Sequence, residues 1–130
     1  MKVFTMGCWD LLHPGHIQHL KKASMLGDHL TVGVYSDEVV ESYKRKPMMD
    51  VYERISLISS VKFVDVAVII SERHGMEYIK HAKPDVLAVG QEWKLTKERR
   101  KLKKLVSKIV KIPYSPNIST TDIITRIREQ

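Results

Sequence analysis

The chain has 130 residues, 43% of them hydrophobic, and a formal net charge of +7. This length suits one folded domain over residues 1–130, and the positive charge favours anionic partners, either nucleic acid or small phosphorylated molecules. No apolar run reaches membrane-spanning length, Met1–Phe4 is expected to begin a strand rather than a signal peptide, and a single cysteine excludes an internal disulfide, which favours a cytoplasmic protein.

The hydrophobic pattern alternates between strands and helices along the chain. Strands are predicted over residues 3–6, 30–35, 64–70, 86–89 and 109–112. Helices are predicted to open after His13, over residues 37–40, 52–61 and 77–82, from Thr96, and behind a cap at Ser119. This alternation predicts an α/β fold with a parallel sheet and helices on both faces. The third strand is almost wholly apolar, which predicts burial on both of its faces.

The first strand runs directly into the sequence Gly7-Cys8-Trp9-Asp10-Leu11-Leu12-His13-Pro14-Gly15-His16, which opens the first helix. His13 and His16 are three residues apart and can face the same side of the first helical turn. Pro14 suits that turn because its missing N–H is not needed there, and Gly15 permits close approach of a ligand to the backbone. Because the N–H groups at a helix start attract anions, two imidazole donors at this position predict a phosphate clamp.

This stretch resembles the HxGH nucleotidylyltransferases, and within them the cytidylyltransferases of the glycerol-3-phosphate type. The similarity continues in order through Ser36-Asp37-Glu38, a basic loop, Tyr52-Glu53-Arg54, Phe63-Val64-Asp65, Gly90-Gln91-Glu92-Trp93 and Ile118-Ser119-Thr120-Thr121. The strand-helix pattern and the resemblance together imply a Rossmann-like five-stranded parallel sheet of order 3-2-1-4-5. The order reverses between the first and fourth strands, so a ligand is expected to touch the loops after Met6 and Val89.

The resemblance implies transfer of CMP from CTP to a phosphorylated alcohol such as glycerol 3-phosphate, with release of pyrophosphate. The acceptor phosphate is already anionic, so catalysis needs positioning and charge stabilisation rather than a general base. The implied catalytic residues are His13, His16 and Arg45. The implied nucleotide-binding residues are Met6, Gly7, Cys8, Gly90, Glu92, Trp93, Ile118, Ser119 and Thr120. The implied substrate-binding residues are Asp10, Lys44, Lys46 and Arg54.

Several of these residues also have purely structural interpretations. Asp10 could satisfy turn N–H groups, and Ser119 could be a plain helix cap. The basic loop at residues 44–46 could be a solvated turn, and Arg54 could be structural. Cys8 fits a small buried side chain, because this chemistry needs no thiol nucleophile. A magnesium ion is expected to arrive with the triphosphate, held mainly by phosphates and water, and the sequence contains no pattern for a protein metal site.

One position departs from the family pattern. Tyr114 stands where the family has an arginine, and a phenol supplies neither charge nor a bidentate fork to a phosphate. Lys94 could substitute for that arginine, or the substrate could differ from that of the typical member. The departure leaves open an adenylyltransferase of the same fold that uses ATP, and also an inactive homologue. The remaining motifs favour CTP.

Three further expectations concern partners and surface residues. The basic helix from Thr96 permits nucleic-acid binding, but no aromatic residue interleaves with its basic residues, so a solvated helix face is favoured. The resemblance implies a homodimer with contacts around residues 54–65, and no membrane partner is expected. The other histidines show no ligand spacing and are expected at the surface: His19, His29, His74 and His81.

Overall fold

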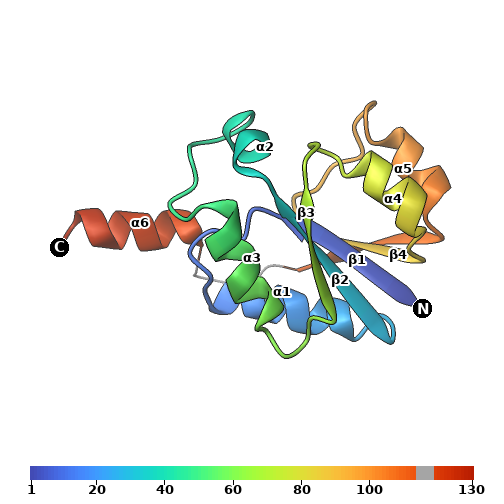
Figure 1. The fold of residues 1–130 in the computed structure, drawn as a ribbon, viewed down its shortest axis with the longest axis horizontal. Coiled ribbons are helices and arrows are strands. Elements are labelled where there is room, and N and C mark those ends of the chain that lie inside the picture. The colour runs from blue at the N-terminus through green and yellow to red at the C-terminus, as the bar shows by residue number, and fades with distance from the viewer. Residues whose placement is uncertain (114–118) are drawn as a thin grey trace.

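The computed structural model of the chain describes residues 1–113 and 119–130. It contains a five-stranded parallel sheet in the order β3-β2-β1-β4-β5, which confirms the predicted Rossmann-like topology (Figure 1). The strands are β1 (Lys2–Gly7), β2 (His29–Tyr35), β3 (Val66–Ile70), β4 (Val86–Gly90) and β5 (Lys108–Ile112). The central strand β1 pairs with both β2 and β4, so the strand order reverses beside it, where open parallel sheets bind their ligands.

Helices cover both faces of the sheet, as predicted (Figure 1). The helices in the described parts of the chain are α1 (Pro14–Ser24), α2 (Asp37–Glu41), α3 (Val51–Ser59), α4 (Met76–Ala82), α5 (Arg100–Leu105) and α6 (Thr120–Arg128). Successive residues of β1 enter two different apolar clusters, because strand side chains alternate between faces. Val3 joins the cluster that contains Leu20 of α1, whereas Phe4 joins the cluster that contains Ile79 of α4 and Leu102 of α5.

The prediction that the third strand is buried on both faces is wrong. The sheet order places β3 at an edge, where no further strand covers it. Val66 is 43% exposed and Ile69 is 40% exposed, although Ile70 is buried. An apolar edge strand reads in sequence like a central one, because the pattern carries no information about which strand is outermost.

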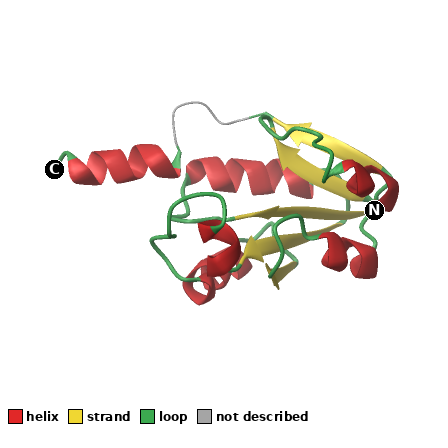
Figure 2. Cartoon of the chain, turned by 90° about the horizontal axis from the view of Figure 1, so that it is seen from above, coloured by secondary structure: helices red, strands yellow, loops and turns green. Residues whose placement is uncertain are grey.

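Two further features of the fold are the residue at which α5 begins and the position of α6. The basic helix begins at Arg100 rather than near Thr96, because residues 96–99 form a turn in which the Arg99 N–H donates to the Thr96 carbonyl. Helix α6 extends beyond the sheet in both views, with the C-terminus at its far end (Figure 1 and Figure 2).

In the described parts of the chain, every helix is too short or too polar to cross a membrane.

Candidate active site

A cavity of about 730 Å³ opens at the carboxyl ends of β1 and β4. Residues that follow both strands line it, together with residues from the first turns of α1 and α6. The predicted meeting of the loops after Met6 and Val89 is therefore confirmed. Eleven of the sixteen predicted site residues line this cavity: Met6, Gly7, Cys8, Asp10, His13, His16, Lys44, Gly90, Glu92, Ser119 and Thr120.

The two histidines at the start of α1 form a reciprocal helix cap. The Gly15 N–H donates to His13 Nδ1 at 3.0 Å, and the His13 N–H donates to His16 Nδ1 at 3.3 Å. Their rings stack with centroids 3.9 Å apart. Because each Nδ1 accepts a backbone hydrogen bond, this geometry assigns the proton of each neutral ring to Nε2. Both rings therefore keep an Nε2–H donor for a ligand in the cavity.

Burial keeps these imidazoles neutral at physiological pH. Burial, together with smaller contributions from His13, His19 and Lys44, lowers the pKa of His16 to about 3. Burial also lowers the pKa of His13, against the opposing effect of Asp122. A neutral donor that is already oriented costs no reorganisation when negative charge develops on a bound phosphate. The histidine pair therefore provides directed hydrogen bonds, while α1 and the basic residues provide positive potential.

The loop between β1 and α1 is held in an unusual conformation. Trp9 and Leu11 have φ angles of 57° and 48°, in the left-handed region that residues with a Cβ rarely adopt. Trp9 is 7% exposed, and its indole N–H donates to the Gly33 carbonyl at 2.9 Å. Such strain persists only where surrounding contacts impose it, and it concentrates at functional loops. The buried indole thus fixes the loop that presents the two histidines.

Asp10 joins this loop to the basic loop. Its two carboxylate oxygens accept the N–H groups of Met48 and Met49 at 2.8 and 3.0 Å, and the side chain is buried. Arg45 Nη2 lies 3.5 Å from the same carboxylate. The Thr120 hydroxyl donates to the Asp10 carbonyl at 2.8 Å. These contacts give Asp10 a positioning role between three segments, which matches its structural interpretation more closely than a direct contact with substrate.

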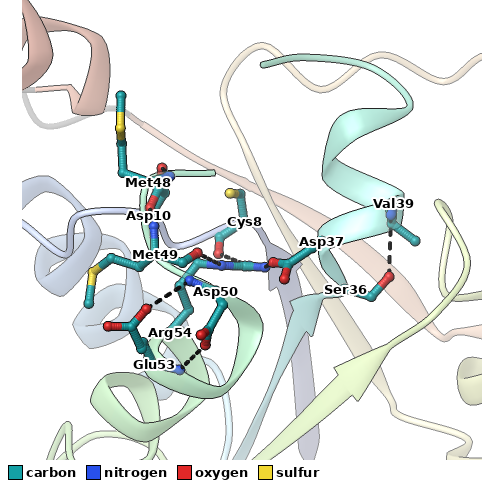
Figure 3. Close-up of polar contacts among 10 residues, drawn as sticks. All are labelled: Cys8, Asp10, Ser36, Asp37, Val39, Met48, Met49, Asp50, Glu53 and Arg54. Atoms are coloured by element: carbon teal, nitrogen blue, oxygen red, sulfur yellow. Dashed lines mark hydrogen bonds and ion pairs between the residues drawn. The ribbon is translucent and has the colours of Figure 1, made fainter. Parts of the chain in front are cut away.

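Arg54 is fully buried and, like Asp10, connects several segments at this edge of the sheet (Figure 3). Its guanidinium donates to the Cys8 carbonyl at 2.7 Å, to the Met49 carbonyl at 3.0 Å and to Asp37 Oδ1 at 2.6 Å. The sequence left open whether Arg54 is structural or contacts substrate. Its burial and its three partners support the structural role, because these groups occupy N–H donors on the guanidinium edge that would otherwise bind an anion.

His19 is not a plain surface residue, contrary to the sequence-based expectation. It lines the cavity, and burial lowers its pKa to about 4 with help from Lys22. The Thr5 hydroxyl gives its single proton to the Ala88 carbonyl at 2.9 Å, so its 2.9 Å contact with His19 Nε2 must receive a proton from the ring. His19 follows His16 by three residues, and this repeated spacing on one helix face was the signal that could have placed it in the site.

The start of α6 closes the other side of the cavity. The Ser119 hydroxyl accepts the Asp122 N–H at 3.1 Å, so Ser119 is the helix cap that its sequence predicts. That hydroxyl still has its own proton to donate, and α6 directs its N-terminal N–H groups toward the cavity lined by Thr120 and Thr121. Two helix N-termini thus face one cavity, an arrangement that suits a chain of phosphates.

The remaining predicted residues lie apart from the main cavity. Arg45, Lys46 and Arg54 do not line it, and Trp93 lines a smaller neighbouring cavity instead. Ile118 and the departing position Tyr114 lie outside the described residues. Sequence reasoning did not select several residues that line the main cavity: Thr5, Trp9, Gly15, His19, Tyr43, Pro113, Thr121 and Asp122.

The Rossmann-like sheet and the paired histidines at the first helix define a protein of the nucleotidyltransferase class. In agreement, the sequence matches the family described as cytidylyltransferase-like over residues 4–126. The chain belongs to this cytidylyltransferase-like family.

Three relatives show how this family member compares with known proteins. The FAD synthase of Thermococcus sibiricus is 37% identical over 139 residues, which cover 99% of this chain and 93% of that protein. The bifunctional protein HldE of Campylobacter jejuni strain RM1221 is 37% identical over 133 residues, and the chain spans 28% of its length. The crystal structure of a lipopolysaccharide core biosynthesis protein from Thermoplasma volcanium has a TM-score of 0.79 and 34% identity, covering 88% of this chain and 98% of that one.

Proposed function

We propose that the chain transfers a nucleoside monophosphate from a nucleoside triphosphate, preferably ATP, to a phosphorylated small molecule. The observation that carries this proposal is the pair of neutral Nε2–H donors on His13 and His16, held at the start of α1 by their own backbone cap. Together with the start of α6, they line a cavity of about 730 Å³, within the size range of nucleotide-sized sites.

The proposed reaction is an in-line displacement at the α-phosphorus. An oxygen of the acceptor phosphate forms the new P–O bond, and the bond from the α-phosphorus to the bridging oxygen breaks. Its electron pair leaves with pyrophosphate. A phosphate monoester is largely dianionic at neutral pH, so no residue needs to remove a proton. The histidines donate hydrogen bonds to phosphate oxygens as negative charge shifts onto them, and the N-terminal ends of α1 and α6 supply positive potential.

The choice of ATP rests on the relatives rather than on a residue that reads the base. FAD contains an adenylyl group, and the chain covers 93% of a relative named FAD synthase. CTP is the second candidate, because the motifs Gly90-Gln91-Glu92-Trp93 and Ile118-Ser119-Thr120-Thr121 follow the cytidylyltransferase pattern. Glycerol 3-phosphate is the acceptor that this second candidate implies.

Magnesium is proposed to enter with the triphosphate. The phosphate oxygens and water would supply most of its ligands, as is usual for this ion at nucleotide sites. Lys44 lines the cavity and would contribute charge to the same phosphates. Arg45 does not line the cavity, and its Nη2 atom lies 3.5 Å from the Asp10 carboxylate, so we assign it no direct phosphate contact.

Pyrophosphate release tests the proposal. The full chain is incubated with magnesium and either ATP or CTP, with glycerol 3-phosphate, a sugar 1-phosphate or flavin mononucleotide as acceptor. We expect release with ATP and at least one acceptor, and a decrease in kcat of about 10²–10³-fold in His16→Ala, the usual cost of losing one such donor. His81→Ala, an exposed histidine outside both cavities, is the matched control. Equal rates in His16→Ala and wild type would contradict the proposed role of the histidine pair.

A further inference from the structure

A second cavity of about 70 Å³ lies beside the main one, on the side of the sheet that α4 and α5 cover. The two cavities share Met6 and Gly90 in their linings, so they adjoin at the ends of β1 and β4. Tyr35, the last residue of β2, and Trp93, which follows β4, line the second cavity. The cavity has room for one small chemical group rather than for a nucleotide.

Two arginines lie over aromatic rings near this cavity, and Arg99 is the one that lines it. The Arg99 guanidinium lies 5.1 Å from the centre of the Trp93 ring, and the Arg73 guanidinium lies 5.0 Å from that of Tyr43. Tyr43 in turn packs edge-on against Tyr35, with centroids 6.1 Å apart. A guanidinium that lies over an aromatic ring can still donate its N–H groups to an anion.

The Arg99 guanidinium keeps donors for a ligand. Arg99 Nη1 donates to the Lys94 carbonyl at 2.9 Å, which fixes the guanidinium and leaves its other N–H groups. Burial and Tyr43 raise the pKa of Tyr35, and the charges of Arg99 and Arg73 oppose that rise. Both guanidinium groups therefore act on the same point at the end of β2.

The other titratable groups near this cavity leave the positive charge of the arginines uncompensated. His74 also lines it, and burial together with Arg99 and Arg73 lowers its pKa, so the ring is neutral. Glu72 accepts the Glu77 N–H at the start of α4 and is thereby turned to the helix. Glu98 is exposed, and its carboxylate is held by its own backbone and by Thr96. Neither carboxylate lines the cavity.

We propose that this cluster of Tyr35, Tyr43, Arg73, Trp93 and Arg99 binds the far end of the acceptor, and that this end carries an anionic group such as a carboxylate. The inference rests on the proposed function, which places the reacting phosphate of the acceptor in the main cavity beside His13 and His16. An acceptor that spans the shared wall at Met6 and Gly90 would then put its remote group beside Arg99, which lines the second cavity. The substrate class is a phosphate ester with a second negative charge, rather than a neutral polyol phosphate.

Calorimetric titration of the full chain with two matched esters tests this inference. The probes are 3-phosphoglycerate and glycerol 3-phosphate, which differ in having a carboxylate or a neutral hydroxymethyl group at the end remote from the phosphate. We expect the wild type to bind 3-phosphoglycerate about tenfold more tightly or better, as charge-assisted hydrogen bonds to a carboxylate predict. Arg99→Met and Arg73→Met should each bring this ratio close to one, and Arg100→Met, an exposed neighbour outside both cavities, should keep it.

Each outcome has a defined meaning. The inference would be overturned if the wild type bound the two esters with equal affinity, or bound neither of them. It would also be overturned if Arg99→Met and Arg73→Met both kept the wild-type preference for 3-phosphoglycerate. Arg73 is exposed, so its variant keeps the test valid even if Arg99→Met fails to fold. Stabilisation by ATP or CTP is measured on the same samples. If the wild type shows no ester preference but is stabilised by a nucleotide, this inference alone is overturned, whereas absence of nucleotide stabilisation overturns the proposed function.

Discussion

Replacement of Arg54 by methionine removes the buried guanidinium that joins three segments at the active edge of the sheet. Its bonds to the Cys8 and Met49 carbonyls lie in the interior, whereas Asp37 is 34% exposed and can be solvated when its partner is lost. We therefore discount the ion pair with Asp37. Leaving these two buried carbonyl groups without a donor costs about 1–3 kcal/mol each, which together predicts a loss of about 3–5 kcal/mol in the free energy of unfolding.

For a chain of this size, that loss corresponds to a decrease in Tm of about 10–20 °C. Urea denaturation and thermal melting of Arg54→Met measure the effect. Arg126→Met makes the same chemical change at an exposed position of α6 and should stay within about 0.5 kcal/mol of the wild type. If both variants lost equally little stability, the buried guanidinium would not hold the loops together, and our account of this edge would be refuted.

Three further predictions follow from the same geometry. His16 has an ordinary pKa of 6.5 and a folded pKa of about 3, so only the unfolded chain gains its proton as the pH falls. The free energy of unfolding should therefore decrease between pH 7 and 5, and it should decrease less steeply in His16→Gln than in the wild type. If the urea midpoints of the two proteins fell equally with pH, His16 would titrate normally. Asp10→Asn replaces one carboxylate oxygen with an N–H₂ group that faces a backbone N–H, so the free energy of unfolding measured in urea should fall by about 1–3 kcal/mol. An unchanged urea midpoint would contradict the positioning role of Asp10. We also expect the homodimer that the family resemblance implies, with contacts around residues 54–65, where Leu57 of α3 is 39% exposed; Leu57→Lys should reduce the mass measured by light scattering to that of a monomer, and a monomeric wild type would exclude this interface.

Local patterns predicted most of the fold because each element carries its own signal. The alternation of strands and helices, the helix predicted over residues 37–40 and the Ser119 cap of α6 all appear where the sequence places them. The histidine pair was found from its spacing and from Pro14 at the first helical position. The strand order needed the family resemblance in addition, because periodicity describes elements and not their neighbours.

Contacts between distant segments could not be predicted in the same way. Arg54 bonds to Cys8, which is 46 residues earlier, and nothing in either local sequence indicates this pairing. Asp10 meets the N–H groups of residues 48 and 49 for the same reason. The proton positions on His13 and His16 depend on which backbone N–H each ring accepts, and only the folded turn fixes that. Trp93 is also predicted at the nucleotide, and its contact with the Arg99 guanidinium, 5.1 Å from the ring centre, was not indicated by the sequence.

Thermal unfolding with Mg·ATP and Mg·CTP tests the central claim most directly, namely that the histidine pair and the two helix starts hold a nucleoside triphosphate. A ligand that binds only the folded chain stabilises it by about 2.7 kcal/mol at one hundred times its Kd. We predict an increase in Tm with Mg·ATP that is larger than with Mg·CTP, is reduced in His16→Ala and is preserved in His81→Ala. No increase with either nucleotide, in a wild-type chain that unfolds cooperatively, would contradict the claim.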